Sequence, residues 1–291
     1  MKVIEAEGQA TKYVFRQSWM NDWMMCNYRA HEVSAKFPDG TPPSFQTATG
    51  TAAHAGVEAD LAGADFDGVC DAISAAYSSE VAKMTVEYRR ANAPEIKRGN
   101  AMATNCAQEL ISQVLPQLRG VDSIEKKFKL LVGREFDLAG APIEIWISGT
   151  WDLDEGPGLP LWDWKTAGGE YQPWQVRRWY IQPTFYTLAK AILNKDITTV
   201  QQFKYGIAVK RVGKPQIQIV DCERGPTEWA WMISLMKDAV DQHTLSMAPR
   251  NDHGWHCSAK WCVVWDECKG AERQLPSVLL NQPTQKAVPN E

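Results

Sequence analysis

The stretch LWDWKTA at residues 161–167 is typical of a half-buried β-strand, because apolar and polar side chains alternate along it. Side chains two positions apart in a strand point to the same face, so Asp163 and Lys165 share one face and Trp164 points to the other. One interpretation is an ion pair on a half-exposed strand, which contributes little to stability. The other is a pair of functional groups held on a rigid strand.

A turn joins this strand to an earlier one. Residues 155–160 are rich in turn-forming Gly and Pro, and residues 141–154 before them alternate like a strand. If the hairpin is symmetric about Pro157 and Gly158, Asp152 lies directly opposite Asp163. Opposed carboxylates repel each other unless a cation lies between them, and Mg²⁺ and Mn²⁺ prefer such oxygen ligands. We therefore consider a divalent metal first, and a carboxylate that caps the turn second.

Outward from this hairpin, the sequence predicts a mixed α/β protein. Apolar residues at helical spacing predict helices at 16–36, 47–63 and most of 67–119. Strand patterns follow at 124–133, 141–154, 159–167, 200–211 and 215–223, with helices at 170–193 and after Pro226. We expect one compact domain in four parts: a helical N-terminal region (1–122), a core (123–248), a cysteine-rich segment (249–270) and a flexible tail (271–291).

Composition narrows the class of protein. The chain of 291 residues is 44% hydrophobic and 23% charged, which is ordinary for a soluble globular protein. Its net charge of −4 does not indicate a general nucleic-acid binder, although a local basic patch is compatible with one. It has neither a membrane-spanning apolar run nor a signal peptide, so we expect a cytoplasmic protein. Disulfides are rare there, so its seven cysteines require burial, metal binding or redox chemistry.

Two further pairs of polar residues lie at helical spacing. His54 and Glu58 are four apart in an alanine-rich helix that follows Gly50, and Gln182 and Tyr186 are four apart in a later helix. Each pair therefore shares one helix face. The ordinary alternatives are a surface or core histidine in the first case and the packing of an amphipathic helix in the second.

Taken together, these motifs resemble the RecB-type branch of the PD-(D/E)XK nuclease superfamily over residues 15–270. The motifs, in chain order, are Gly50-x-x-x-His54-x-x-x-Glu58, Gly149-x-x-Asp152, Asp163-x-Lys165 and Gln182-x-x-x-Tyr186. Each motif is weak alone, but the four in this order are specific. The resemblance implies a restriction-endonuclease-like core, which is a mixed central sheet flanked by helices.

The resemblance also implies a site. Mg²⁺ or Mn²⁺ would be held by His54, Asp152, Asp163 and the main-chain carbonyl of Trp164. Lys165 would act beside the attacking water. The remaining catalytic-site residues implied by the motifs are Glu58, Gln182 and Tyr186. In this arrangement Trp164 buries the opposite face of the strand and holds Asp163 and Lys165 rigid.

The cysteines resemble the iron–sulfur subset of the same family, which includes AddB-like helicase–nuclease domains and CRISPR-adaptation-type exonucleases. The pattern consists of Cys26-x-x-Arg29 near the N-terminus and Cys257, Cys262 and Cys268 near the C-terminus. It implies that these four cysteines bind a [4Fe–4S] cluster. The four residues between Cys257 and Cys262 depart from the two that are commonest in the subset.

A zinc site is the alternative for this segment, because His253 and His256 lie beside Cys257 and mixed Cys/His sites suit Zn²⁺. The other cysteines, Cys70, Cys106 and Cys222, lie in apolar helical or strand contexts, so we expect buried thiols.

The resemblance implies a metal-dependent deoxyribonuclease, and we expect an exonuclease of DNA recombination, repair or phage DNA processing in a bacterial or phage-infected cell. Its partner would be DNA, single-stranded or with free ends, with a helicase or recombinase as a further partner and no membrane. Arg177 and Arg178 are the expected phosphate contacts. Two alternatives stay open: a catalytically inactive nucleic-acid-binding module, and a zinc-binding interaction protein. The motifs do not set the polarity of digestion or the oligomeric state.

Overall fold

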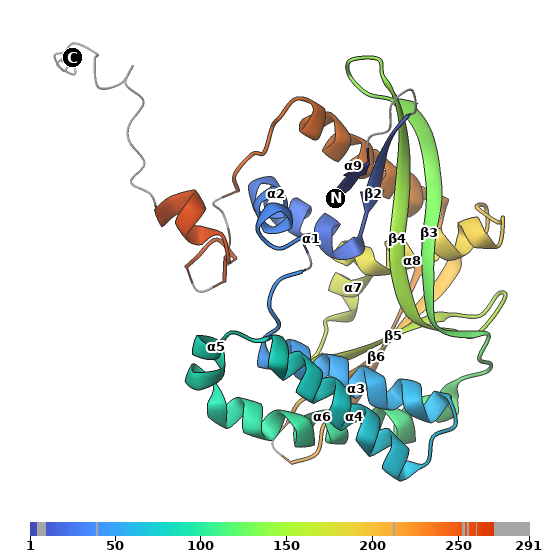
Figure 1. Ribbon diagram of the computed structural model, residues 1–291. Helices are drawn as coiled ribbons and strands as arrows, with labels where there is room; N and C mark the ends of the chain where they lie inside the picture. Colours follow the sequence, from blue (N-terminus) through green and yellow to red (C-terminus); the bar gives the residue numbers. More distant parts are fainter. Residues whose placement is uncertain are drawn as a thin grey trace, which may run out of the picture.

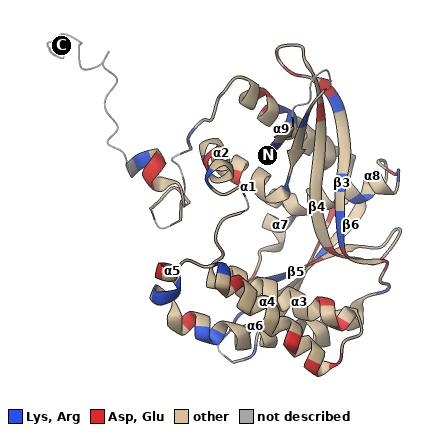
Figure 2. Cartoon of the chain, viewed as in Figure 1, with Lys and Arg blue, Asp and Glu red and all other residues tan. Residues whose placement is uncertain are grey.

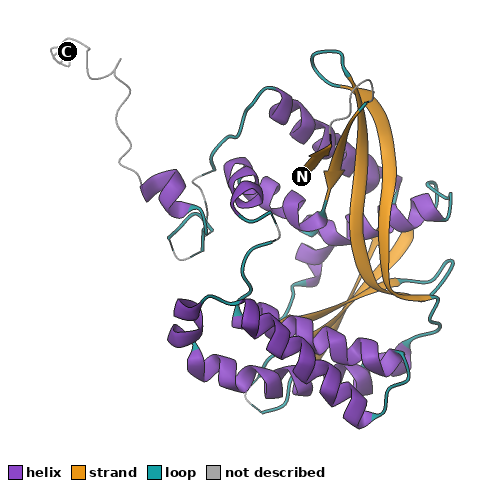
Figure 3. Cartoon of the chain, viewed as in Figure 1, coloured by secondary structure: helices purple, strands orange, loops and turns teal. Residues whose placement is uncertain are grey.

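The computed structural model describes residues 1–4, 10–38, 40–211, 213–251, 254, 256–259 and 261–270. A seven-stranded mixed sheet forms its centre, and helices cover both faces (Figures 1 and 3). In the part of the chain that is described, no helix is both long enough and apolar enough to cross a bilayer. The expected tail at 271–291 and His253 lie outside the described residues.

The sheet combines parallel and antiparallel neighbours. Its strands are β1 (Lys2–Ile4), β2 (Thr11–Phe15), β3 (Ser123–Phe136), β4 (Pro142–Asp154), β5 (Leu161–Ala167), β6 (Gln201–Val209) and β7 (Gln216–Arg224). Their order is β1-β2-β4-β5-β6-β7, and β3 pairs with β4 along its other edge. The pairs β2–β4 and β5–β6 are parallel, whereas the other neighbours are antiparallel. This mixed sheet agrees with the expected fold class.

One edge of β4 is shared by two strands. Residues 143–147 pair with β2, and Leu153 and Asp154 pair with β5. Within the described sheet, residues 148–152 on this edge pair with neither strand, so the sheet opens between β2 and β5. We call this stretch the split edge of β4.

Helices from the N-terminal half cover one face of β5 and β6 (Figure 1). They are α3 (Phe45–Leu61), α4 (Phe66–Lys83), α5 (Val86–Ala91) and α6 (Ala93–Gln113), followed by the 3₁₀ turn η1 (Leu115–Gln117). Ser44 caps α3 by accepting a hydrogen bond from the backbone N–H of Thr47. Small residues let α3 pack closely: a Cβ at Gly56 would lie 2.7 Å from the side chain of Ile73.

The other face is covered by helices from the N-terminal region and from the second half of the chain. They are α1 (Gln17–Met25), α2 (Asn27–Lys36), α7 (Pro173–Trp179), α8 (Ile181–Leu193) and α9 (Pro226–Thr244). Their apolar side chains form one core with the strands, and Phe15, Met20, Phe185 and Met236 are completely buried in it. A short π-helical turn, η2 (Asp266–Gly270), ends the described chain.

Buried charges fix the turn between β4 and β5. The ammonium of Lys190 on α8 is 2.5 Å from Oδ1 of Asp154 and donates hydrogen bonds to the carbonyls of Gly156 and Leu159, at 2.8 and 2.7 Å. Lys190 is 1% exposed. A buried lysine without these acceptors would be costly, so the three contacts hold the turn against α8 in one register.

The structure corrects several expectations for secondary structure. The predicted helix at 16–36 is two helices, α1 and α2, separated by Cys26 in an extended conformation. The predicted helix at 170–193 is also two helices, α7 and α8, which are separated by Tyr180, and Pro183 lies in the first turn of α8.

The expected helical region 1–122 also contains strands β1 and β2. Strand β2 cannot be recognised from neighbouring sequence, because its partner is β4, far along the chain. Thr11 pairs with Ile143. Cys106 and Cys222 are buried as expected, but Cys70 is only half-buried.

Candidate active site

Two carboxylates lie where β4 and β5 separate. The last paired residues of this hairpin are Leu153 and Trp162, and the same register places Asp152 opposite Asp163. This register agrees with the symmetric hairpin expected from the sequence. Both side chains are buried, at 7% and 1% exposure. Asp152 is held in place because its Oδ2 accepts a hydrogen bond of 2.7 Å from the backbone N–H of Trp164.

His54 and Glu125 approach Asp152 from two other elements. Nδ1 of His54, on α3, is 3.3 Å from Oδ2 of Asp152. One ligand atom from each of His54, Glu125 and Asp152 lies within 4.8 Å of the other two. We call these three residues the carboxylate–histidine group. Its members could hold one metal ion together.

Glu125 was not found by sequence reasoning. It belongs to β3, where the pairs Ile124–Leu153 and Lys126–Trp151 place it opposite Asp152. Its φ of +46° is in the left-handed region, which is strained for a residue with a side chain and recurs at functional sites. Glu125 belongs to none of the sequence motifs, and only the β3–β4 pairing reveals its place.

Asp163 is engaged by a cation and an amide. Nζ of Lys165 forms an ion pair with Oδ2 of Asp163, and Nε2 of Gln182 donates a 2.6 Å hydrogen bond to Oδ1. The hydroxyl of Tyr205 donates a 3.1 Å hydrogen bond to Oε1 of Gln182, and Lys165 lies 5.8 Å above the ring centre of Tyr205. Asp163 is therefore beside the carboxylate–histidine group and outside it.

The remaining predicted residues surround this centre. Glu58 is exposed one turn after His54, and its charge acts on both His54 and Asp152. Tyr186 lies one turn after Gln182 and hydrogen-bonds to it. Burial raises the pKa of Tyr186, and the charge of Asp163 raises it further.

Trp164 lies as the alternation predicts. Its ring is 2% exposed, belongs to the core under α3, α4 and α6, and stacks on Trp162 with 5.6 Å between ring centres. A Cβ at Gly206 on β6 would lie 2.9 Å from this ring, so glycine makes room for it. The backbone of Trp164 also lies within hydrogen-bonding reach of His54.

Burial, together with neighbouring charges, shifts the pKa values of the site residues. Burial raises the pKa of Asp152 and of Asp163 to about 6 each, despite the opposing charge of Lys165. Burial and the charge of Asp152 raise the pKa of Glu125 to about 7. Burial and Lys165 lower the pKa of His54 to about 4. Burial disfavours the charged form of Lys165, but Asp163 and Asp152 outweigh it and raise its pKa. The metal-free site therefore retains protons near neutral pH that a bound cation would displace.

A polar groove runs along the split edge of β4, next to the site. Its lining consists of Arg16, Gln17, Ser18, Lys127, Phe128, Ser148, Gly149, Thr150 and Tyr186. A Cβ at Gly149 would lie 2.8 Å from the ring of Phe128 and 3.4 Å from that of Tyr186, so glycine keeps the floor of the groove open. Arg16 and Lys127 make the groove basic, and Figure 2 shows further basic residues on β3 and α5.

A scan of protein families matches the model described as the PD-(D/E)XK nuclease superfamily over residues 20–269. The chain belongs to this superfamily. Membership indicates a metal-dependent nuclease, and the carboxylate–histidine group suits that chemistry.

Two other comparisons add little to this assignment. A search of curated proteins found no match. One similar solved structure is titled "Crystal structure of SSO0001". It is 12% identical with a TM-score of 0.34, and the match covers 92% of this chain and 88% of that one.

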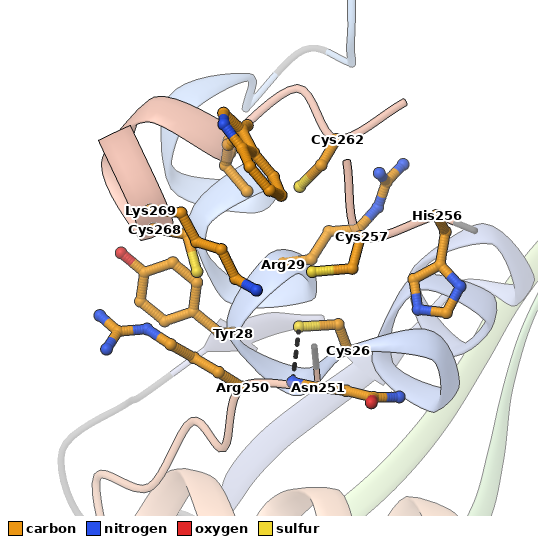
Figure 4. Close-up of a pocket in the computed structure, with 12 residues that line it drawn as sticks. Cys26, Tyr28, Arg29, Arg250, Asn251, His256, Cys257, Cys262, Cys268 and Lys269 are labelled. Atoms are coloured by element: carbon orange, nitrogen blue, oxygen red, sulfur yellow. Dashed lines mark hydrogen bonds between the residues drawn. The ribbon is translucent and has the colours of Figure 1, made fainter. Parts of the chain in front are cut away.

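Within this superfamily member, the four cysteines of the predicted cluster line one pocket (Figure 4). Cys26, between α1 and α2, faces Cys257, Cys262 and Cys268 from the C-terminal segment. Sγ of Cys26 accepts a 3.4 Å hydrogen bond from the backbone N–H of Asn251. Among the described residues, no three of the four sulfurs lie within 4.8 Å of one another, whereas the three ligand atoms of the carboxylate–histidine group do.

Arg29 and His256 also line this cysteine pocket. Arg29 pairs with Asp22 at 2.9 Å and donates a 3.1 Å hydrogen bond to the carbonyl of Trp261, so it ties α2 to the C-terminal segment. His256 lines the same pocket as the four cysteines, as the zinc alternative requires.

The two expected phosphate contacts lie on α7 and not in the groove beside Tyr186. Arg177 and Arg178 are exposed on α7, and Nε of Arg177 is 3.4 Å from the carbonyl oxygen of Asp221 on β7. Arg177 lines a groove with β7 residues and not the groove beside Tyr186.

Proposed function

We propose that this protein is a Mg²⁺- or Mn²⁺-dependent deoxyribonuclease that hydrolyses phosphodiester bonds at the carboxylate–histidine group. One observation carries the proposal: His54, Glu125 and Asp152 offer three ligand atoms within 4.8 Å, and the Asp163–Lys165 pair lies beside them. Four elements, α3, β3, β4 and β5, bring these five side chains to one place. Five titratable residues with shifted pKa values at one place are typical of a catalytic centre.

The donor set fits a divalent cation. Two carboxylates and an imidazole suit Mn²⁺ well, and carboxylates and water suit Mg²⁺. Oδ2 of Asp163 has no hydrogen bond of ordinary geometry among the described residues, although Lys165 pairs with it. We propose His54, Glu125 and Asp152 as ligands, with Asp163 and the Trp164 carbonyl as the further ligands implied by the motifs.

The metal, when bound, supplies Lewis acidity and an activated water. Lys165 supplies a fixed positive charge: Asp163 and Asp152 raise its pKa, so the ammonium remains protonated. It therefore suits the orientation of water and the stabilisation of negative charge on phosphate better than the removal of a proton. Gln182 bridges Asp163 and Tyr205, so its role is to hold Asp163 in position.

The surroundings favour a polyanionic substrate. The groove beside the site contains Arg16 and Lys127, with Phe128 and Tyr186 as aromatic neighbours, and this combination suits a nucleic-acid strand. We propose DNA, single-stranded or with free ends, and exonuclease action in recombination, repair or phage DNA processing, with a helicase or recombinase as partner. The intact Asp163–Lys165 pair favours an active enzyme over a binding module without activity.

We propose further that Cys26, Cys257, Cys262 and Cys268 bind a [4Fe–4S] cluster. Their common pocket supports this ligand set. Zinc held by Cys257, Cys262, Cys268 and a neighbouring histidine stays the alternative for this segment. The cluster would join α1 and α2 to the C-terminal segment and would have no catalytic role.

The test is digestion of end-labelled single-stranded and double-stranded DNA with Mg²⁺, Mn²⁺ or EDTA, with circular DNA as control. We expect cleavage with either metal, none in EDTA, and a requirement for a free end. Cleavage of circular DNA would contradict exonuclease action. A protein that binds Mn²⁺ and DNA but cleaves neither form would contradict the nuclease proposal.

A further inference from the structure

Two tryptophans on α7 are exposed side by side. Trp174 and Trp179 are 52% and 56% exposed, and their ring centres are 4.7 Å apart in an edge-to-face arrangement. Arg177 and Arg178 lie between them in the sequence, and both are exposed. Val176 is fully buried, so it anchors the opposite side of the helix. Burial of large aromatic rings is strongly favourable, so two such rings exposed to solvent at one place indicate a binding surface.

Helix α7 is attached to the floor of the candidate active site. It follows β5, which carries Lys165, and it is flanked by Tyr171 and Tyr180. Both tyrosines pack against Tyr205, at 5.8 and 6.4 Å between ring centres. The hydroxyl of Tyr205 in turn donates to Gln182, which holds Asp163. The exposed tryptophans are therefore linked to the site by one aromatic cluster.

A buried arginine makes this attachment rigid. Arg224 is 4% exposed and donates hydrogen bonds to the carbonyls of Val176 and Tyr180, at 2.9 and 3.2 Å. Its Nε also donates to the hydroxyl of Thr184 on α8, at 2.8 Å. The end of α7 and the start of α8 are thus held by one side chain, so α7 keeps a fixed position beside the site.

Tyr186 in the groove and Tyr180, the N-cap residue that follows α7, lie on either side of Gln182 along the chain. Tyr186 lines the groove, Gln182 contacts Asp163 one turn earlier, and Tyr180 joins α8 to α7. With a rise of about 1.5 Å per residue, Tyr186 and Tyr180 are separated by about 9 Å along the helix. A strand that runs from the groove across the site would therefore reach the exposed face of α7.

We propose that the face formed by Trp174, Arg177, Arg178 and Trp179 is a stacking platform for bases of single-stranded DNA beside the active site. The inference rests on the proposed nuclease function. Charge on α7 itself favours a nucleic acid over a protein, because residues 171–180 contain two arginines and no acidic residue; the acidic residues Asp221, Glu223 and Glu228 lie in the groove next to Arg177. Bases stack on exposed aromatic rings irrespective of sequence, and arginine adds cation–π contacts and phosphate pairing. Only a single strand offers unpaired bases to such a surface.

Binding measured without cleavage tests the platform. Fluorescence anisotropy of labelled oligothymidylate, titrated in EDTA, gives the Kd for wild type and for Trp174→Ala, Trp179→Ala and the double variant. We expect the double variant to bind at least tenfold more weakly, which corresponds to the loss of about one stacked base. Trp174→Phe, which retains an aromatic face, should keep affinity within about threefold of wild type.

The matched control is Trp231→Ala on α9, since Trp231 is also exposed, at 45%. It should bind within twofold of wild type. Thermal melting of every variant checks that the fold is intact. A blunt duplex of the same length provides a second control, because its internal bases cannot stack on protein, and its Kd should change by less than twofold in the double variant.

Arg178→Ala gives an independent measurement. The slope of log K against log salt should decrease by about 0.7 if Arg178 neutralises one phosphate of a single strand. An unchanged slope would overturn this part of the platform.

The outcomes separate the platform from the nuclease proposal. If the double variant binds single strands as wild type does, or if duplex and single strands lose affinity equally, the platform is overturned, and the tryptophans serve another partner. If wild type binds single strands through these tryptophans but cleaves no DNA with Mg²⁺ or Mn²⁺, the nuclease proposal fails while the platform stands.

Discussion

The carboxylate–histidine group and the cysteine pocket are built in opposite ways. The first is assembled from α3, β3 and β4, and each aspartate near it is already fixed by a hydrogen bond, from Trp164 or from Gln182. The second takes three of its four cysteines from a segment at 256–270 in which the structure describes turns and one π-helical turn. Val264 is buried there, whereas the three cysteines are half-buried.

The comparison distinguishes a site whose residues are held in place by regular elements from a proposed site that would need a bound metal group for its order. Regular elements hold the carboxylates close together even without a cation, and burial, with added repulsion from neighbouring carboxylates, raises their pKa values. The cysteine segment has little core of its own, so a bound metal group would be its main source of order. Removal of metal should therefore leave the first site in place and loosen the second.

The largest effect is expected for the Asp163–Lys165 pair. Asp163→Asn and Lys165→Ala should each reduce metal-dependent cleavage at least about 100-fold while the thermal midpoint stays near that of wild type, because loss of such charge stabilisation is typically of this size. Asp221→Asn and Lys204→Ala are matched controls, since these residues form an ion pair of 3.4 Å on β6 and β7 outside the site. Near wild-type cleavage by either site variant would contradict its assigned role.

Substitutions in the cysteine pocket should lower thermal stability and should not affect the chemistry of cleavage. Anaerobically purified protein should be brown, with about four irons per chain. Cys26→Ala should abolish the colour and lower the thermal midpoint by several degrees, because a ligand that binds only the folded state stabilises it. Cys70→Ala, at a half-buried position on α4, is the control and should keep its iron. A colourless wild type with one zinc that survives Cys26→Ala would rule out the cluster.

The raised pKa of Glu125 can be tested through the pH dependence of thermal stability in the absence of metal. The pKa of Glu125 is raised to about 7 in the folded protein, so its stability contribution is greatest below pH 4.5 and is lost as pH rises toward 7. Glu125→Gln should raise the midpoint of the EDTA-treated protein by a few degrees at pH 8 and leave it unchanged at pH 4. The same variant should reduce stabilisation by Mn²⁺. A pH-independent difference between variant and wild type would show that Glu125 does not titrate in this way.

The smallest effect is expected at His54. His54→Ala should reduce cleavage more with Mn²⁺ than with Mg²⁺, by a few-fold, because imidazole suits the softer ion better. Parallel kcat measurements in the two metals at saturating concentration test this difference. Equal losses in both would indicate that His54 is not a ligand.

The sequence predicted most of the fold where signals are local. The alternation at 161–167 and the turn before it set the register that brings Asp152 opposite Asp163, and helical spacing identified His54 with Glu58. Sequence reasoning did not find Glu125 or β2, because their positions depend on pairing with β4. For β2 this partner lies far along the chain. Family resemblance predicted that Cys26 acts with the C-terminal cysteines, and the four line one pocket, although the break between α1 and α2 that presents Cys26 has no strong sequence signal.

The parallel pairing of β2 with β4 also affects the order in which the chain can fold during synthesis. Thr11 pairs with Ile143, so β2 leaves the ribosome 132 residues before its partner exists. At about 5–20 residues per second, this delay is on the order of ten seconds. During that time β1 and β2 have no sheet to join, and an open strand edge can pair with other chains. The β3–β4–β5 meander needs only neighbouring sequence, so it can form before the N-terminus docks. The oldest part of the nascent chain is thus among the last to reach its final place.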